Sequence, residues 1–311
     1  MLIGMSGKCA AVFSCLGLGD GLIALVLANN LRLQGVDVTL FHPFLEQLQN
    51  WFPSIKISPF PSVDALSAYD AFYIIYEKSE RMFTILNYCE QHFPFQTVVL
   101  NPIATRRKNY PYWSEGKFEG THSFVDNLVA FCHEGLKIDP ATKDNGIYVP
   151  EGVKVKRYTK RVVLHPTSSR PSKDWPMEKF IELAHLLHQE GFDPVFILSQ
   201  EERKGWDLSK IQAPLFSNLH EMATYVAESG YMIGNDSGIG HLASCLGLPT
   251  VTVCRNHQVA KFWRPGWSQG SVVTPYPWIP NIKGMRWRDQ YWKRWVSVKR
   301  VMREFLNQQD C

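Results

Sequence analysis

The chain has 311 residues, of which 45% are hydrophobic and 20% are charged, as is ordinary for a soluble globular enzyme. No apolar run approaches the ~18 residues that a transmembrane helix needs, so we expect no membrane-spanning segment. The length exceeds what one hydrophobic core usually serves, and we therefore expect two domains.

The charge is distributed unevenly between the two halves. Residues 1–150 hold 11 Lys and Arg against 14 Asp and Glu, whereas residues 151–311 hold 22 against 15. A basic C-terminal half is typical of proteins that bind an anionic ligand or a charged surface. A solvated, mildly basic face explains the same numbers, and both interpretations stay open here. We expect no nucleic-acid partner.

The cysteines point to a reducing compartment. They are odd in number, scattered and without a Cys-x-x-Cys pair, so we expect neither a disulfide framework nor structural zinc. The apolar N-terminus has no basic region, and we interpret it as leading into a first strand and not as a signal peptide. These features predict a cytoplasmic protein.

Strand and helix patterns alternate through the first half. Apolar runs predict strands, and apolar residues at helical spacing predict helices between them. The expected strands are 10–17, 36–41, 71–76 and 97–100, and the expected helices are 21–35, 44–52, 79–93 and 122–136. Repeated units of this kind imply a parallel, doubly wound sheet.

A second series begins after an irregular stretch, and we place the domain boundary near residues 150–160. Its expected strands are 161–166 and 193–199, its expected helices are 177–191 and 220–230, and a terminal helix is expected over 288–308. Two such halves suggest two Rossmann-like domains facing a cleft. Ligands of open parallel sheets bind at the carboxyl ends of the strands, where three polar clusters fall.

The first cluster is the loop Gly17-Leu18-Gly19-Asp20-Gly21, between the first strand and the first helix. Its glycines allow a sharp turn, but they do not complete the Gly-x-Gly-x-x-Gly pattern of dinucleotide sites. Asp20 has two open interpretations. It caps the helix, or it is a general base that removes a proton from an acceptor hydroxyl.

The second cluster is HPTSSRPSKDWP, residues 165–176. The hydroxyls of Thr167 and Ser168 at a helix start, with the charge of Lys173, favour a phosphate cradle. The alternative is a hydroxyl-rich turn that caps the helix, with its cations in solvent.

The third cluster is NDSGIGH, residues 235–241, between an apolar strand and a short helix. Its backbone amides at a helix N-terminus favour a diphosphate, and His241 in the first turn is placed to donate to a phosphate oxygen. We expect Gly238 and Gly240 to keep the helix start open. Asp236 holds the loop or contacts a sugar hydroxyl. An Asp cap beside a core histidine is the alternative.

Together these stretches resemble glycosyltransferase family 9, the ADP-heptose:lipopolysaccharide heptosyltransferases. The matching pieces are LGDGL, HPTSSRPSKDWPMEKFIELA and YMIGNDSGIGHLASCLGLPTVTV, in the family's order. The resemblance implies an α/β protein with the GT-B fold, in which two Rossmann-like domains face a cleft. We expect an acceptor-binding domain over 1–155 and a nucleotide-sugar domain over 156–285. Residues 286–311 would form a C-terminal helix that packs on the N-terminal domain or touches a membrane.

The resemblance also implies the chemistry. It is an inverting, metal-independent transfer of a sugar, heptose from ADP-heptose, to a lipopolysaccharide-core or related glycan acceptor, with no cofactor. The chain contains no Asp-x-Asp, in keeping with a metal-free site. Asp20 matches the family's proposed base, and the donor diphosphate would be held by Lys173, Asp236, Ser237, Gly238 and His241, which the hydroxyls of Thr167 and Ser168 would supplement.

Other assignments rest on composition alone. Arg81, Arg106 and Arg107, with Lys108 beside them, are our candidates for an anionic acceptor, and solvated surface charge explains them equally well. Residues 255–295 match no motif of the family, which leaves another hexose open. A GT-B-fold sugar-nucleotide epimerase and a non-catalytic nucleotide-sugar-binding homologue are the alternative functions. A lipid-linked acceptor would bring the protein to the inner face of the cytoplasmic membrane.

Overall fold

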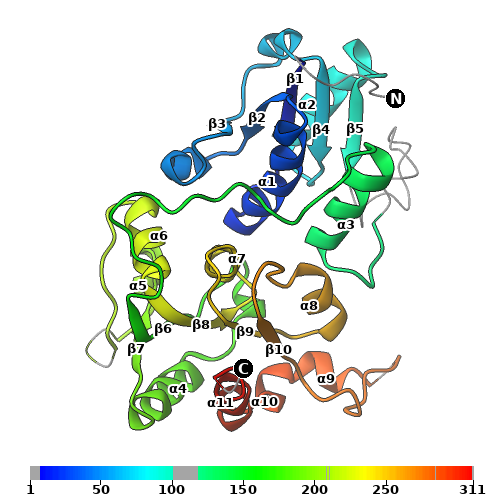
Figure 1. Ribbon diagram of the computed structural model, residues 1–311. Helices are drawn as coiled ribbons and strands as arrows, with labels where there is room; N and C mark the ends of the chain where they lie inside the picture. Colours follow the sequence, from blue (N-terminus) through cyan, green and yellow to red (C-terminus); the bar gives the residue numbers. More distant parts are fainter. Residues whose placement is uncertain (1–7, 101–117, 208, 210, 284, 310–311) are drawn as a thin grey trace. The chain divides into compact units, whose positions relative to one another are not determined.

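The computed structural model describes residues 8–100, 118–207, 209, 211–283 and 285–309 (Figure 1). The chain divides into two compact units, Met1–Pro150 and Glu151–Cys311, and each contains a five-stranded sheet. All named strands pair in parallel. The predicted α/β class with two Rossmann-like sheets is confirmed.

The sheet of the first unit has the strand order β3-β2-β1-β4-β5. Its strands are β1 (Cys9–Phe13), β2 (Asp37–Phe41), β3 (Lys56–Ser58), β4 (Ala71–Ile75) and β5 (Thr97–Leu100), and its helices are α1 (Leu18–Leu33), η1 (Leu45–Trp51), η2 (Val63–Ala68), α2 (Glu80–His92), α3 (Phe124–Ala130) and η5 (Phe131–Gly135). The chain leaves β1 in one direction for β2 and β3 and then returns to its other side for β4. The switch point therefore lies between β1 and β4.

The helices cover this sheet on both faces. Met82, Ile85 and Leu86 of α2 pack on every second strand residue, among them Phe13 and Phe72. Helix α1 is buried on nearly all sides, with twelve buried residues from Gly19 to Leu31. Part of its cover is the segment 142–145, which crosses the helix. Its backbone carbonyls accept from the Asn29 and Asn30 side chains at 3.0 and 2.8 Å.

The sheet of the second unit has the order β10-β9-β8-β6-β7. Its strands are β6 (Tyr158–His165), β7 (Asp193–Phe196), β8 (Ser229–Asn235), β9 (Thr250–Val253) and β10 (Gly270–Val273), and its helices are η6 (Pro171–Lys173), α4 (Met177–Gln189), α5 (Gln200–Arg203), α6 (Leu219–Ala227), α7 (Gly238–Cys245), α8 (His257–Trp263), α9 (Trp287–Gln290), α10 (Trp292–Trp295) and α11 (Val298–Leu306). Here the switch point lies between β6 and β8.

The end of the chain completes the core of the second unit. Trp292, Val296, Val298 and Met302 are buried in the same cluster as Phe180 and Leu183 of α4. Figure 1 shows α4 and α11 together on one face of this sheet. The buried apolar residues of this C-terminal segment, which we expected to pack on the N-terminal domain or to touch a membrane, therefore lie on the sheet and helix α4 of their own unit. Trp295 of the same segment is 41% exposed.

Several predicted elements need correction. The single helix expected over 288–308 is wrong, because Val296 is extended and the Ser297 side chain caps a new helix by accepting from the Arg300 amide. The helix expected over 122–136 changes to a π-helix at Phe131. Strands β3 and β10 and helix α8 were not predicted. No helix in the described part of the chain is long and apolar enough to cross a membrane.

Gly230 in β8 provides a test of the packing between β6 and β8. The register of these strands shifts between Tyr158 and Val162, which brings the two backbones close. A Cβ atom at Gly230 would collide with the backbone carbonyl of Thr159. We expect Gly230→Ala to lower the free energy of unfolding by about 2 kcal/mol or more, because neither backbone can yield without breaking the ladder. Urea denaturation measures the loss.

Gly205→Ala is the matched control. A Cβ atom there meets only the Glu202 carbonyl at 3.9 Å, an ordinary contact. Its effect should stay within about 0.5 kcal/mol. Equal stabilities of the two variants would show that the backbones of β6 and β8 lie farther apart at Gly230 than described.

Candidate functional site

The polar clusters lie at the topological switch points of the sheets. The first cluster lies at that of the first unit, and the second and third lie at that of the second unit. In the second unit, β6 leads into the loop before η6, and β8 leads directly into α7. Because neighbouring parallel strands end at the same edge, the second and third clusters lie side by side. Ligands of such folds bind at this kind of edge.

Asn235 joins the two loops at this edge. It is 1% exposed, its side-chain oxygen accepts from the Trp175 amide at 3.0 Å, and its side-chain nitrogen donates to the Pro166 carbonyl. One side chain thus fixes both ends of the segment between Pro166 and Trp175. Our sequence analysis did not single out Asn235. In the sequence, the only indication of its role was an asparagine at the end of an apolar strand.

Trp175 holds the same segment through its buried side chain. Its ring is 1% exposed and packs edge-on against Phe180, with the ring centroids 5.0 Å apart. The indole nitrogen donates to the Val296 carbonyl at 3.1 Å. These contacts fix the start of α4.

Lys173 and Asp236 face each other across the two loops. The Lys173 Nζ lies 3.6 Å from the Asp236 Oδ2, and the two side chains are 40% and 14% exposed. Cys254 at the end of β9 lies within electrostatic reach of both. Burial raises the pKa of the Cys254 thiol, and Asp236 raises it further, whereas Lys173 lowers it. Because the Lys173 side chain is 40% exposed, its ammonium group stays accessible from solvent despite the ion pair.

The start of α7 holds two buried polar atoms without a partner. Ser237 is the residue before the first turn, but its side chain caps no amide, and its Oγ is buried and unpaired. The His241 Nδ1 is also buried and unpaired. Burial lowers the pKa of His241, and Asp236 and the Trp263 backbone counteract it only in part. Unpaired buried polar atoms are costly, so a ligand that satisfies them would be favoured.

The other predicted donor residues have different neighbours. The Ser168 hydroxyl lies 2.6 Å from an Asp174 carboxylate oxygen, so it orders its own loop. The Thr167 hydroxyl is buried and has no hydrogen-bond partner among the described residues. Burial raises the pKa of the Glu202 carboxyl group, but hydrogen bonds such as the one from the Ser199 amide bring it below its ordinary value. At Gly240 a Cβ atom would point at Met232 and Pro265, toward the protein interior. Gly240 therefore does not open the helix start, contrary to our expectation.

In the first unit, Asp20 is the third residue of α1. The residue that precedes the helix is Gly17, so Asp20 is not its N-cap. A Cβ atom at Gly17 would lie 2.5 Å from the Asp20 Oδ2, which means that the carboxylate bends back over this glycine. A side chain at position 17 would displace the Asp20 carboxylate from this place.

A second carboxylate lies near Asp20. Glu77, which follows β4, accepts from the Leu16 amide at 3.1 Å through Oε2, whereas its Oε1 is buried and unpaired. Burial raises the pKa of the Cys15 thiol, and the charges of Asp20 and Glu77 raise it further. The loop after β1 and the end of β4 thus place two acids around the Cys15 thiol at the switch point. Glu77 was not among our candidates.

His42 holds the same loop from the end of β2. Its Nδ1 accepts from the Leu45 amide at 3.1 Å, which leaves the proton on Nε2, and Nε2 donates to the Gly17 carbonyl at 3.1 Å. The ring fills the space beside Gly21, where a Cβ atom would lie 2.8 Å away. His42 is fully buried. It is a positioning residue for the loop that carries Asp20.

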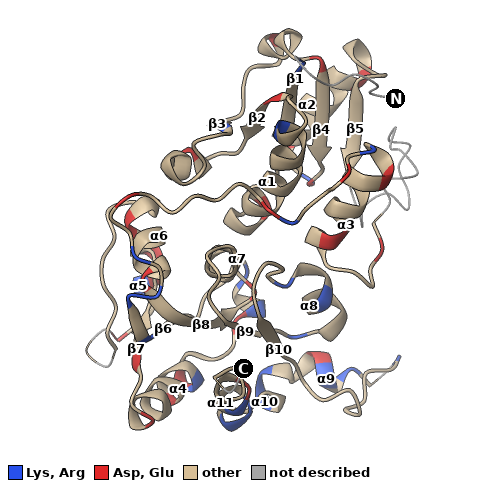
Figure 2. Cartoon of the chain, viewed as in Figure 1, with Lys and Arg blue, Asp and Glu red and all other residues tan. Residues whose placement is uncertain are grey.

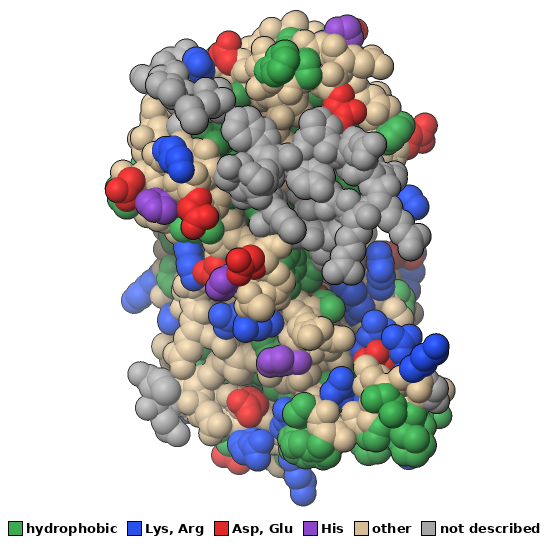
Figure 3. Space-filling model, turned by 90° about the vertical axis from the view of Figure 1, so that its right-hand side faces the viewer, with side chains coloured by type: hydrophobic (Ala, Val, Ile, Leu, Met, Phe, Trp, Pro, Cys, Tyr) green, Lys and Arg blue, Asp and Glu red, His purple; other side chains and the backbone are tan. Residues whose placement is uncertain are grey.

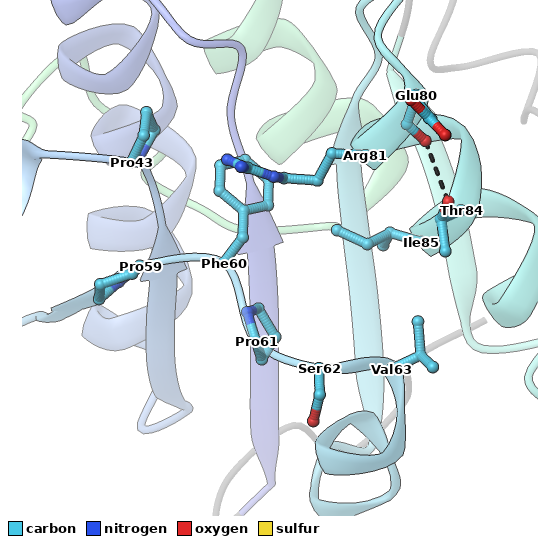
Figure 4. Close-up of a pocket in the computed structure, with 10 residues that line it drawn as sticks. All are labelled: Pro43, Pro59, Phe60, Pro61, Ser62, Val63, Glu80, Arg81, Thr84 and Ile85. Atoms are coloured by element: carbon cyan, nitrogen blue, oxygen red, sulfur yellow. Dashed lines mark hydrogen bonds between the residues drawn. The ribbon is translucent and has the colours of Figure 1, made fainter.

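Arg81 lines a cavity of about 740 Å³ near this edge (Figure 4). Its guanidinium group lies 5.2 Å from the centre of the Phe60 ring, and prolines from the loops after β2 and β3 form the opposite walls. The cavity combines apolar walls with one cation and the acid Glu80. Arg106, Arg107 and Lys108 lie outside the described residues.

The described residues include no group of three or more His, Cys, Asp or Glu side chains placed to hold a metal ion.

Comparisons with known proteins agree with this geometry. The family model of glycosyltransferase family 9 (heptosyltransferase) matches residues 142–280, which include both loops of the second unit. The resemblance to glycosyltransferase family 9 is therefore confirmed.

One relative in this family is a lipopolysaccharide core heptosyltransferase, OpsX, from Haemophilus influenzae. It is 26% identical over 149 residues, which cover 40% of this chain and 43% of the relative. The matched part of the chain thus spans less than half the length of that relative.

Solved structures of the family extend the likeness in fold. A family 9 glycosyltransferase from Veillonella parvula matches with a TM-score of 0.71 at 16% identity, covering 97% of each chain. The ADP-heptose lipopolysaccharide heptosyltransferase II of E. coli matches with a TM-score of 0.68 at 16% identity, covering 97% of this chain and 99% of that one. These structures share the fold across almost the whole chain.

Because His42 is buried, we expect the free energy of unfolding to fall at acid pH. Burial lowers the pKa of His42 from 6.5 to about 4, although its bond to the Gly17 carbonyl counteracts part of this effect. The unfolded chain therefore takes up the proton first as the pH falls, and stability declines between about pH 6.5 and pH 4. We expect His42 to account for about 3 kcal/mol of this decline. Urea denaturation across this pH range measures it.

His42→Gln should reduce the pH dependence, because it removes the titrating group. His185→Gln, at an exposed position of α4, is the control and should leave the pH dependence unchanged. His165 and His241 also have lowered pKa values because they are buried, so part of the decline will remain. A His42→Gln curve parallel to that of the wild type would contradict the assignment.

Proposed function

We propose that the chain is an inverting glycosyltransferase that moves heptose from ADP-heptose to a lipopolysaccharide-core or related glycan acceptor. The observation that carries the proposal is the strand-end cradle of the second unit, where Lys173 and the start of α7 lie at one switch point. The names of the H. influenzae and E. coli proteins support the choice of heptose, ADP and acceptor class.

The donor diphosphate would lie at the start of α7. The first amides of a helix have no intrahelical partners, and the helix dipole favours negative charge there. Lys173 adds a cation that Asp236 holds at 3.6 Å. As the bond between the sugar and the diphosphate breaks, the leaving group carries away the electron pair. The amides and Lys173 would stabilise the growing charge. His241 would add to this only with a proton on Nδ1, because its other ring nitrogen is engaged with the Trp263 backbone.

Asp20 would act as the general base. It takes the proton from the acceptor hydroxyl while that oxygen forms its bond to the anomeric carbon, on the face opposite the diphosphate. One displacement of this kind inverts the configuration and needs no covalent intermediate. Gly17 and His42 keep the Asp20 loop in place.

The proposed reaction needs neither a metal ion nor a cofactor, because the cation and the helix amides perform the charge stabilisation that a metal ion would otherwise provide. The acceptor would bind in the first unit, with Arg81 and the cavity beside it as the nearest candidates. A lipid-linked acceptor would place the enzyme in the cytoplasm, at the inner face of the membrane.

Asp20→Asn tests the base most directly. The side chain keeps its shape but cannot take the proton, so we expect kcat to fall by about a thousandfold. Affinity for ADP-heptose should stay within about twofold, because the donor site is built from other residues. Mass spectrometry of the product, with EDTA present throughout, measures transfer, and thermal shift measures donor binding.

Glu46→Gln, an exposed carboxylate of the same unit, is the control and should retain full activity. Full turnover of Asp20→Asn would refute the base, and loss of turnover in EDTA would refute a metal-free mechanism. Conversion of the sugar without any acceptor would instead identify an epimerase. Donor binding without either reaction would identify a non-catalytic homologue.

A further inference from the structure

The segment 276–295 exposes an unusual set of apolar side chains, which we call the aromatic platform. Six of the 14 large hydrophobic residues that are exposed in the described chain fall within it. They are Trp278 (73% exposed), Ile282 (67%), Met285 (37%), Trp287 (50%), Tyr291 (44%) and Trp295 (41%). Concentrated exposure of this kind marks an interaction surface, unlike single exposed hydrophobic residues.

The backbone of the platform is held in place. Ile282 and Met285 exchange backbone hydrogen bonds of 3.1 and 2.9 Å, and the Arg288 guanidinium donates to the Pro277 carbonyl at 2.8 Å. The ring of Trp278 stacks on Tyr276 at 4.1 Å, and Arg300 lies over the other ring of the pair at 4.1 Å from its centre. The exposed rings are therefore presented by an ordered surface.

The platform is attached to the donor cradle. Lys179 of α4 donates to the carbonyls of Lys293 and Val296 at 2.6 and 2.7 Å, and the Lys293 Nζ lies 3.2 Å from the Pro171 carbonyl. These bonds fix α10 next to the loop that carries Lys173. A surface that binds the platform would thus be close to the donor site within the same unit.

Basic residues alternate with the apolar ones. Five cations lie between residues 278 and 296, namely Lys283, Arg286, Arg288, Lys293 and Arg294, against one acid, Asp289. Figure 2 shows these cations on and around α9 and α10, and Figure 3 shows hydrophobic side chains beside Lys and Arg at the lower end of the second unit. The partner should therefore be apolar inside and negatively charged at its surface.

We propose that the aromatic platform docks the protein on a lipid bilayer with anionic headgroups. Tryptophan and tyrosine rings insert at the headgroup level, and neighbouring lysines and arginines bind the phosphates.

A protein interface is also rich in Trp, Tyr, Met and Arg, so the residue types alone do not separate a protein partner from a membrane. The platform, however, carries five cations against one acid, and charge of a single sign favours an anionic lipid surface.

This inference rests on the proposed function only for its purpose, which is to bring the transferase to a lipid-linked acceptor. Binding to vesicles requires neither donor nor turnover. Asp20→Asn should therefore bind vesicles like the wild type, and failure of one proposal can be distinguished from failure of the other.

Co-sedimentation with vesicles tests the surface. The full chain is mixed with vesicles of phosphatidylcholine, or of equal parts phosphatidylcholine and phosphatidylglycerol. We expect binding to the anionic vesicles that weakens as salt is added. Lys283→Gln, Arg286→Gln and Arg294→Gln together should weaken it about a hundredfold, since each cation near an anionic surface contributes about fivefold.

Trp278→Ser with Trp287→Ser should weaken binding about tenfold or more by removing the inserted rings. Phe95→Ser with Leu215→Ser is the control and should bind like the wild type, because these residues are 91% and 67% exposed and do not belong to the platform segment. Unchanged thermal unfolding shows that each variant is folded. Equal vesicle binding by wild type and both platform variants would overturn the proposal. So would a wild-type dimer that the tryptophan variant converts to a monomer.

Discussion

The candidate donor site depends on one buried amide. Asn235 accepts from the Trp175 amide and donates to the Pro166 carbonyl, and this links the last residue of β8 to both ends of the loop after β6. The loop carries Lys173, and the residue after Asn235 is Asp236. The hydrogen bonds of Asn235 therefore fix the backbone of the Lys173 loop relative to the start of α7. Such preorganisation is what stabilisation of a departing anion requires.

The first unit holds its acid by a similar arrangement with different residues. His42 donates to the Gly17 carbonyl, and Glu77 accepts from the Leu16 amide, so the ends of β2 and β4 grip the loop that follows β1. In both units the proposed reactive group lies on the loop at the switch point, and the neighbouring strands supply the supports. The loops of Asp20 and Lys173 are thus braced in a similar way.

Much of this arrangement follows from local sequence. Continuous apolar runs predicted β1, β2, β4 and β6, and polar clusters after them marked the switch points before the strand order was known. Short or mixed strands such as β3 (KIS) and β10 (GSVV) carry too little pattern to be recognised. The terminal helix was predicted as one because Ser297 interrupts it without a proline or glycine to mark the break.

The supporting residues could not be predicted, because their partners are distant in sequence. His42 is 25 residues from Gly17, Glu77 is 61 from Leu16, and Asn235 is 60 from Trp175. A histidine or an asparagine at a strand end has no distinctive local pattern, and its role appears only when the sheet brings the loops together. The candidate reactive residues, by contrast, are surrounded by glycines and hydroxyls that are visible within a few positions.

The central claim is that the cradle of the second unit binds a diphosphate. Calorimetric titration of the full chain with ADP and with AMP tests it most directly, because the two ligands differ only in the second phosphate. Charge-assisted hydrogen bonds to that phosphate should make ADP bind about tenfold to a hundredfold tighter. Asn235→Leu should abolish most of the difference. Equal dissociation constants for ADP and AMP in the wild-type protein would contradict the account.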